Sequence, residues 1–261
     1  MHLKCRLLVS DPLFEPSQFD ILQEVIVDVL PTWVESMRLE VGEYHALPIH
    51  RGERWHESLM KLPATRRGLG SASLESNAGG VSFFLGHSER TIPIETNYIA
   101  VEIVDVELVE SRPCDFVLAK LFDAFTARLP VRYAHAELHD EYDWSNMEIT
   151  PECTRAIGVA FQQHLPGLYW LNHFGSDYCE FMGRDRVLSA PAYEVWESGQ
   201  GVSIRLSESP TTWKKPDYHR QKKAVIEHLG KPYFFSRFEP DREHLAPDFF
   251  EIVKQRRESQ G

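Results

Sequence analysis

The first part of the chain changes from a strand-like to a helix-like pattern. Residues 2–9 read as a strand, an apolar run that Lys4 and Arg6 interrupt. A helix follows, and we expect Ser17 to be its N-cap. Its apolar residues recur at helical spacing: Leu22, Val25, Ile26, Val29 and Leu30. Pro31 predicts the end of this helix, because proline lacks the N–H group that the helix would use.

The middle of the chain predicts a strand pair and then a helix. Residues 81–87 (VSFFLGH) and residues 97–108 (NYIAVEIVDVEL) are separated by a turn around Thr91–Pro93, so we expect them to pair antiparallel. Pro113 is suited to the beginning of a helix, and residues 116–125 carry the apolar stripe of that helix.

Two further helices are expected on either side of this region. A short one is expected near Trp55–Leu62, inside residues 41–78, which are rich in glycine and proline. The other is predicted to begin at Thr150-Pro151-Glu152 and to continue through residues 157–165.

The last third begins with an aromatic-rich segment, residues 165–175, which reads as extended. A helix should follow from Ser176, and residues 193–206 read as a β-hairpin. Pro216 opens a further helix, which Gly230 should stop. The polar tail from Lys254 onward is expected to fray.

Frequent hairpins without strict βα alternation favour an α+β fold. We expect an antiparallel or mixed β-sheet with helices packed mainly on one side. No repeat or low-complexity linker divides the chain, so residues 1–261 are predicted to form a single domain.

The chain is acidic, with 28 basic residues against 39 acidic ones and a net charge of −11. This charge disfavours binding to phosphate backbones, and it would attract a partner with a basic surface as well as aid solubility. Four scattered cysteines form no CxxC motif, and no apolar run approaches the roughly 20 residues that span a bilayer. We therefore expect a cytoplasmic protein that binds neither nucleic acid nor membrane.

His135, Glu137 and His139 share one face of a strand predicted over residues 131–139. Two histidines and a carboxylate suggest a metal site, but His135 and His139 would lie roughly 13 Å apart along a strand. One ion does not bridge that distance, so we expect no metal and no cofactor. The other interpretation of this pattern is an amphipathic strand whose polar face meets solvent.

The next residues combine three carboxylates and two aromatic rings in a predicted loop: Asp140, Glu141, Tyr142, Asp143 and Trp144. Rigid aromatic area next to negative charge suits a protein-binding surface. In an alternative interpretation, Trp144 packs inward. The basic cluster of residues 214–223 is expected to be a solvated helix face. Neither a GxSxG nor an HExxH motif is present.

The C-terminal half resembles bacterial immunity proteins of polymorphic-toxin and type VI secretion systems, most closely the family numbered immunity protein 52. The residues that carry this resemblance are Pro166–Asn172, Gly175, Gly183, Leu188–Pro191, the hairpin Tyr193–Leu206, His228–Gly230 and Tyr233–Phe235. The resemblance implies an α+β fold, no catalysis and tight binding to a cognate toxin. The alternative is an uncharacterised hydrolase that uses histidines and carboxylates around residues 135–143.

Overall fold

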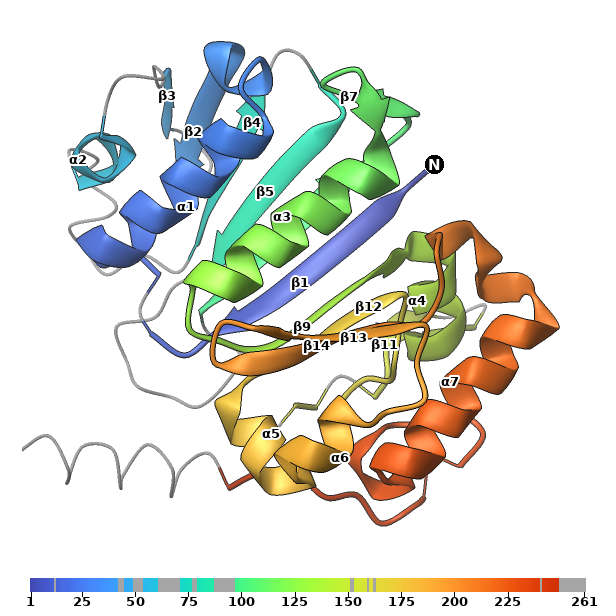
Figure 1. The fold of residues 1–261 in the computed structure, drawn as a ribbon. Coiled ribbons are helices and arrows are strands. Elements are labelled where there is room, and N and C mark those ends of the chain that lie inside the picture. Colours follow the sequence, from blue (N-terminus) through green and yellow to red (C-terminus); the bar gives the residue numbers. More distant parts are fainter. Residues whose placement is uncertain are drawn as a thin grey trace, which may run out of the picture.

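A ten-stranded antiparallel sheet forms the centre of the molecule (Figure 1). The computed structural model describes residues 1–11, 13–41, 45–48, 54–60, 71–76, 79–86, 97–150, 153–158, 160–161, 163–239 and 241–248. The strand order is β13-β14-β12-β9-β1-β6-β5-β4-β2-β3. Strand β1 therefore lies in the interior of the sheet, paired with β6 on one side and β9 on the other.

The ten strands are β1 (Leu3–Val9), β2 (Met37–Val41), β3 (His45–Pro48), β4 (Ser71–Ser76), β5 (Val81–Gly86), β6 (Tyr98–Ile103), β9 (Val131–Leu138), β12 (Leu171–Phe174), β13 (Glu194–Ser198) and β14 (Gly201–Arg205). Two short pairs are β7 (Leu108–Val109) with β8 (Arg112–Pro113), and β10 (Met147–Ile149) with β11 (Thr154–Ala156). The helices are α1 (Pro16–Val29), α2 (Trp55–Met60), α3 (Cys114–Arg128), α4 (His139–Asn146), α5 (Ser176–Met182), α6 (Arg184–Leu188) and α7 (Pro216–Leu229).

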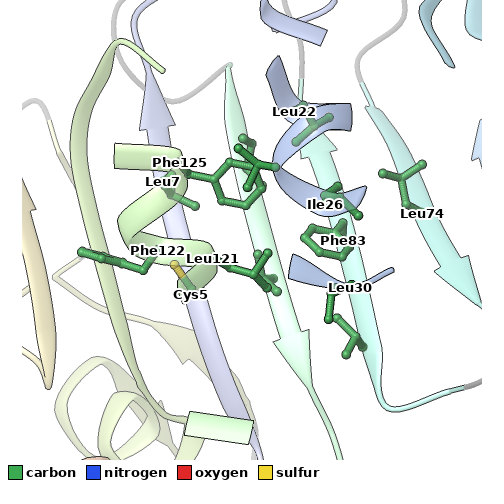
Figure 2. Packing of buried hydrophobic residues seen from close by; sticks show 14 of the residues in the cluster. Cys5, Leu7, Leu22, Ile26, Leu30, Leu74, Phe83, Leu121, Phe122 and Phe125 are labelled. Atoms are coloured by element: carbon green, nitrogen blue, oxygen red, sulfur yellow. The ribbon is translucent and has the colours of Figure 1, made fainter. Parts of the chain in front are cut away.

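One face of the sheet packs against α1 and α3. These two helices contact each other and lie across β5 and β1 in Figure 1. Cys5 and Leu7 of β1 point into this core because alternate strand residues share a face. Figure 2 shows Leu7 near Phe125 and Cys5 near Phe122 of α3, whereas Phe83 of β5 lies near Ile26 of α1.

The opposite face carries a second core over the C-terminal strands. Leu8 of β1 and Tyr133 of β9 belong to it. Helix α5 contacts β9, β12 and β14, and α7 packs on α6 (Figure 1). The α+β class and the antiparallel sheet are thus confirmed, with helices on one face in the N-terminal half and on the other face in the C-terminal half. Among the helices described, none is long and apolar enough to cross a membrane.

Several predicted elements are confirmed with small changes at their ends. Helix α1 ends at Val29, before Pro31, but it begins at Pro16 with Glu15 as its N-cap, so the expected cap at Ser17 is wrong. The predicted strand pair is β5 with β6, and the predicted hairpin is β13 with β14. Helix α7 ends before Gly230, whose φ of 125° is readily adopted only by glycine.

The helix predicted from Thr150 is wrong in the part of residues 150–165 that the structure describes. Residues Thr154–Ala156 form strand β11 instead, which pairs with β10. The Thr150 side chain does accept the backbone N–H of Cys153, as an N-cap would, at 3.1 Å. The Thr150 N–H also donates to the Cys153 carbonyl at 2.8 Å, which closes a hairpin turn. The predicted turn at residues 91–93 and the tail from residue 254 lie outside the described residues.

We predict a single cooperative unfolding transition for the whole chain, because strands β1, β9 and β12 contribute side chains to both cores. Leu7→Ala and Leu8→Ala remove neighbouring side chains that lie in different cores. Each should cost about 2–5 kcal/mol and lower one shared melting temperature by several degrees. Thermal unfolding followed by circular dichroism and by tryptophan fluorescence tests this. Two separate transitions, each sensitive to only one substitution, would show that the cores are independent domains.

Candidate functional site around helix α4

The predicted binding loop of residues 140–144 is a helix. It belongs to α4, which follows directly on β9. Asp140 and Glu141 lie in the first turn of α4, where negative charge stabilises the positive end of the helix dipole. The acidic run therefore begins a helix, and the helix directs the five predicted residues to different sides.

Glu141 points into the protein and is 1% exposed. Its Oε1 atom accepts hydrogen bonds from the Tyr218 hydroxyl at 2.9 Å and from Lys222 Nζ at 3.0 Å. Both partners belong to α7, so this contact fixes α4 against that helix. Glu141 therefore positions α4 and is not part of its accessible surface.

The other two carboxylates of α4 are accessible, and each lies beside a basic side chain of the same chain. Asp140 Oδ2 is 3.8 Å from Lys214 Nζ, and Asp143 Oδ2 is 3.3 Å from His139 Nε2. Exposed pairs of this kind contribute little to stability, because solvent screens them. The basic cluster of residues 214–223 thus serves partly as the counter-charge of α4, not only as a solvated face.

Trp144 is 47% exposed, so it does not pack fully inward. Its ring lies 5.5 Å from that of Phe238 and 6.4 Å from that of Trp213, measured between centroids. Arg237 lies over the same ring and donates a hydrogen bond to the Trp144 carbonyl. Contact with Phe238 could not be predicted, because that residue follows in an irregular segment far along the chain.

A groove of about 520 Å³, lined by charged, aromatic and apolar residues, runs along the other side of α4. Tyr142 and Asp143 of α4 form part of its wall, together with residues of β1, β5, β6 and β9. Burial, and then the charge of Glu137, raise the pKa of Tyr142 to about 12. The Tyr142 hydroxyl therefore stays protonated at neutral pH and can donate a hydrogen bond.

His135 and Glu137 lie deep in this groove, and each is 2% exposed. His135 Nδ1 and Glu137 Oε2 are 2.6 Å apart, within hydrogen-bonding distance. The His135 ring also stacks on Tyr169 at 4.8 Å between centroids. The expected solvent-facing polar strand is therefore wrong, because α4 and the Tyr169 segment cover this face of β9.

Two cations from β1 complete the groove. Lys4 pairs with Glu102 at 3.1 Å. Arg6 lies between the rings of Tyr98 and Phe161, at 5.1 and 5.5 Å from their centroids. Acidic, basic and aromatic groups therefore all line the groove.

The three residues that suggested a metal site, His135, Glu137 and His139, do not converge on one point. His135 is engaged with Glu137, whereas His139 has left the strand and begins α4. Among the described residues, no group of three or more His, Cys, Asp or Glu side chains is arranged to hold a metal ion. The prediction of no bound metal remains to be tested by elemental analysis of protein purified without chelator.

The comparisons with known proteins concern the fold. No protein-family model and no curated protein matches the chain. The structure is similar to that of the Pseudomonas aeruginosa T6SS protein PA0821, with a TM-score of 0.52 and 14% sequence identity. The match covers 92% of this chain and 83% of that chain. The likeness therefore extends over nearly the whole fold, and at this identity it concerns the fold alone.

We predict that Lys222→Met destabilises the protein by about 3 kcal/mol, because it leaves the buried Glu141 carboxylate without its counter-charge. Glu141→Gln combined with Lys222→Met should recover much of the loss. Lys223→Met is a matched control, since Lys223 is exposed on the same helix, and it should change the free energy of unfolding by less than about 0.5 kcal/mol. Urea denaturation measures the free energy of unfolding of Lys222→Met, of the double variant and of Lys223→Met. Equal losses for Lys222→Met and Lys223→Met would contradict a buried ion pair.

Proposed function

We propose that this chain is an immunity protein that binds a cognate bacterial toxin and neutralises it without catalysis. The observation that carries the proposal is the fold similarity, over 92% of the chain, to a protein named as a T6SS protein. The sequence resemblance of the C-terminal half to immunity proteins supports the same function. Its aromatic residues Tyr169 and Trp170 are buried, so they form the scaffold and leave recognition to other surfaces.

The surface that we propose for the toxin is the outer side of α4. Asp140, Asp143 and Trp144 are its accessible members, and Tyr142 lines the adjoining groove. Glu141 contributes by holding the helix in place. A half-exposed tryptophan next to two carboxylates suits a toxin with a basic surface, because charge steers the encounter and the aromatic ring anchors the complex.

The second candidate function is a hydrolase, and the observation that favours it is the His135–Glu137 pair in the groove. A carboxylate that orients a histidine is a common arrangement for a general base. This function needs the His135 ring nitrogens, whereas the immunity function needs only the surface that the ring supports. His135→Gln, checked for folding by circular dichroism, therefore distinguishes the two.

The decisive experiment is protection from toxicity. A toxin gene directly upstream of this gene would be expressed in bacteria with and without the chain. Restored growth with both the wild type and His135→Gln, and co-purification of the two proteins, would support the immunity function. A gene neighbourhood of metabolic enzymes, or protection that His135→Gln abolishes, would favour the hydrolase.

We predict that α4 controls the kinetics of toxin binding. Asp140→Lys with Asp143→Lys should slow association roughly tenfold at low ionic strength, and less at high salt where charges are screened. Trp144→Ala should instead speed dissociation by about 30-fold, the effect of losing roughly 2 kcal/mol at an aromatic anchor. Surface plasmon resonance of folded variants measures both rates.

Glu194→Lys is the control for these variants, because that carboxylate lies on β13, away from α4. It should leave both rates nearly unchanged. If the double charge reversal and Trp144→Ala also leave both rates unchanged, α4 is not the interface.

A further inference from the structure

A hollow of about 400 Å³ lies on the Trp144 side of α4. Its walls come from α4, from α7 and from the irregular segment of residues 234–239. Helix α4 thus separates this hollow from the groove that contains His135 and Glu137, since Trp144 and Ser145 line the hollow and Tyr142 and Asp143 line the groove. The volume is within the range of pockets that bind small ligands. One or two side chains of a partner have a similar size and would fit in it.

Two aromatic side chains at the rim of this hollow are poorly buried. Phe238 is 71% exposed, and its ring lies 5.5 Å from the half-exposed ring of Trp144. Contact between large aromatic side chains and water is unfavourable. Covering such side chains with a partner therefore contributes much binding free energy. The pair therefore offers an apolar contact for a side chain that enters the hollow.

The charge around the hollow is opposite in sign to that of the chain. Five cationic side chains line it against two carboxylates, Glu227 and Glu239. The cations are Lys222, Lys223, Lys231, Arg237 and Arg242. Three of them are paired with carboxylates within the chain, namely Glu141, Glu227 and Glu239. Lys223 and Arg237 form no ion pair with any described residue, and both are exposed.

We infer that this hollow binds an acidic segment of a partner protein, which places an apolar side chain against Trp144 and Phe238 and its carboxylates near Lys223 and Arg237. The inference rests on the proposed function, in which that partner is the toxin. It adds that the toxin approaches α4 from two sides with opposite charges, a basic surface toward Asp140 and Asp143 and an acidic segment in the hollow.

A protein segment fits the hollow better than a nucleic acid. The chain as a whole carries a net charge of −11, and Asp140 lies one turn of α4 before Trp144, which lines the hollow. A phosphate backbone would be repelled along most of its path, whereas a short acidic peptide meets only the local positive charge.

The test uses fluorescence polarisation with three labelled peptides of equal length. The first contains glutamates around a central phenylalanine, the second replaces the glutamates by lysines, and the third replaces the phenylalanine by serine. The first should bind at least tenfold more tightly than the other two, and added salt should weaken it. Lys223→Glu and Phe238→Ser should each weaken it by about tenfold.

Two matched variants serve as controls. Arg220→Glu makes the same charge change on α7 but outside the hollow, and Tyr193→Ser removes an exposed aromatic ring elsewhere. Both should leave binding within about twofold of the wild type. The inference is overturned if the acidic peptide does not bind at millimolar concentration, if the lysine peptide binds equally well, or if a labelled oligothymidylate binds in its place. It is also overturned if the control variants weaken binding as much as Lys223→Glu and Phe238→Ser.

The peptide assay uses no toxin, so its result does not depend on whether the proposed immunity function is correct. Peptide binding in a chain that protects from no toxin would refute the immunity function and leave the acidic-segment site standing. If the chain protects against a toxin but binds no acidic peptide, the immunity function would be supported and the acidic-segment site would be refuted.

Discussion

The carboxylate of Glu141 fixes helix α4 to helix α7. It is buried, and it meets the Lys222 ammonium and the Tyr218 hydroxyl together. A buried carboxylate with two such partners permits only a narrow range of helix orientations. A rotation that breaks the Lys222 contact leaves a buried charge without its counter-charge, and one that breaks the Tyr218 contact leaves a buried hydroxyl without an acceptor. The orientation of α4 then decides which of its side chains reach solvent, and both proposed contact surfaces depend on it.

Helix α4 gives the protein two different recognition environments a few residues apart. On one side, Tyr142 and Asp143 border a groove that contains the buried His135–Glu137 pair. On the other side, Trp144 borders an aromatic hollow with positive charge. A partner that covers α4 would meet both environments at once. Such a mixed pattern of charge favours specificity, because a protein with a uniform surface charge would be repelled on one side.

Secondary-structure elements are predicted well where neighbouring residues determine them. They are predicted poorly where they depend on contacts with residues far away in the chain. Alternation and turn residues identified the β13–β14 hairpin, and proline with glycine marked the ends of α7. Thr150 gave a local signal that two structures share, since a threonine that accepts an N–H three residues later occurs in helix caps and in hairpin turns. The burial of Glu141 could not be predicted, because Tyr218 and Lys222 are 77 and 81 residues away.

The interior position of β1 has a consequence for how the chain is made. Leu3 pairs with Ile103 on one side and with Leu138 on the other, so β1 is synthesised before the two strands that flank it. Contacts between such distant parts of a chain slow folding, because a long loop must close before they form. During synthesis the exposed edges of β1 can pair with other chains, so rapid dilution or a chaperone should improve the yield of native protein.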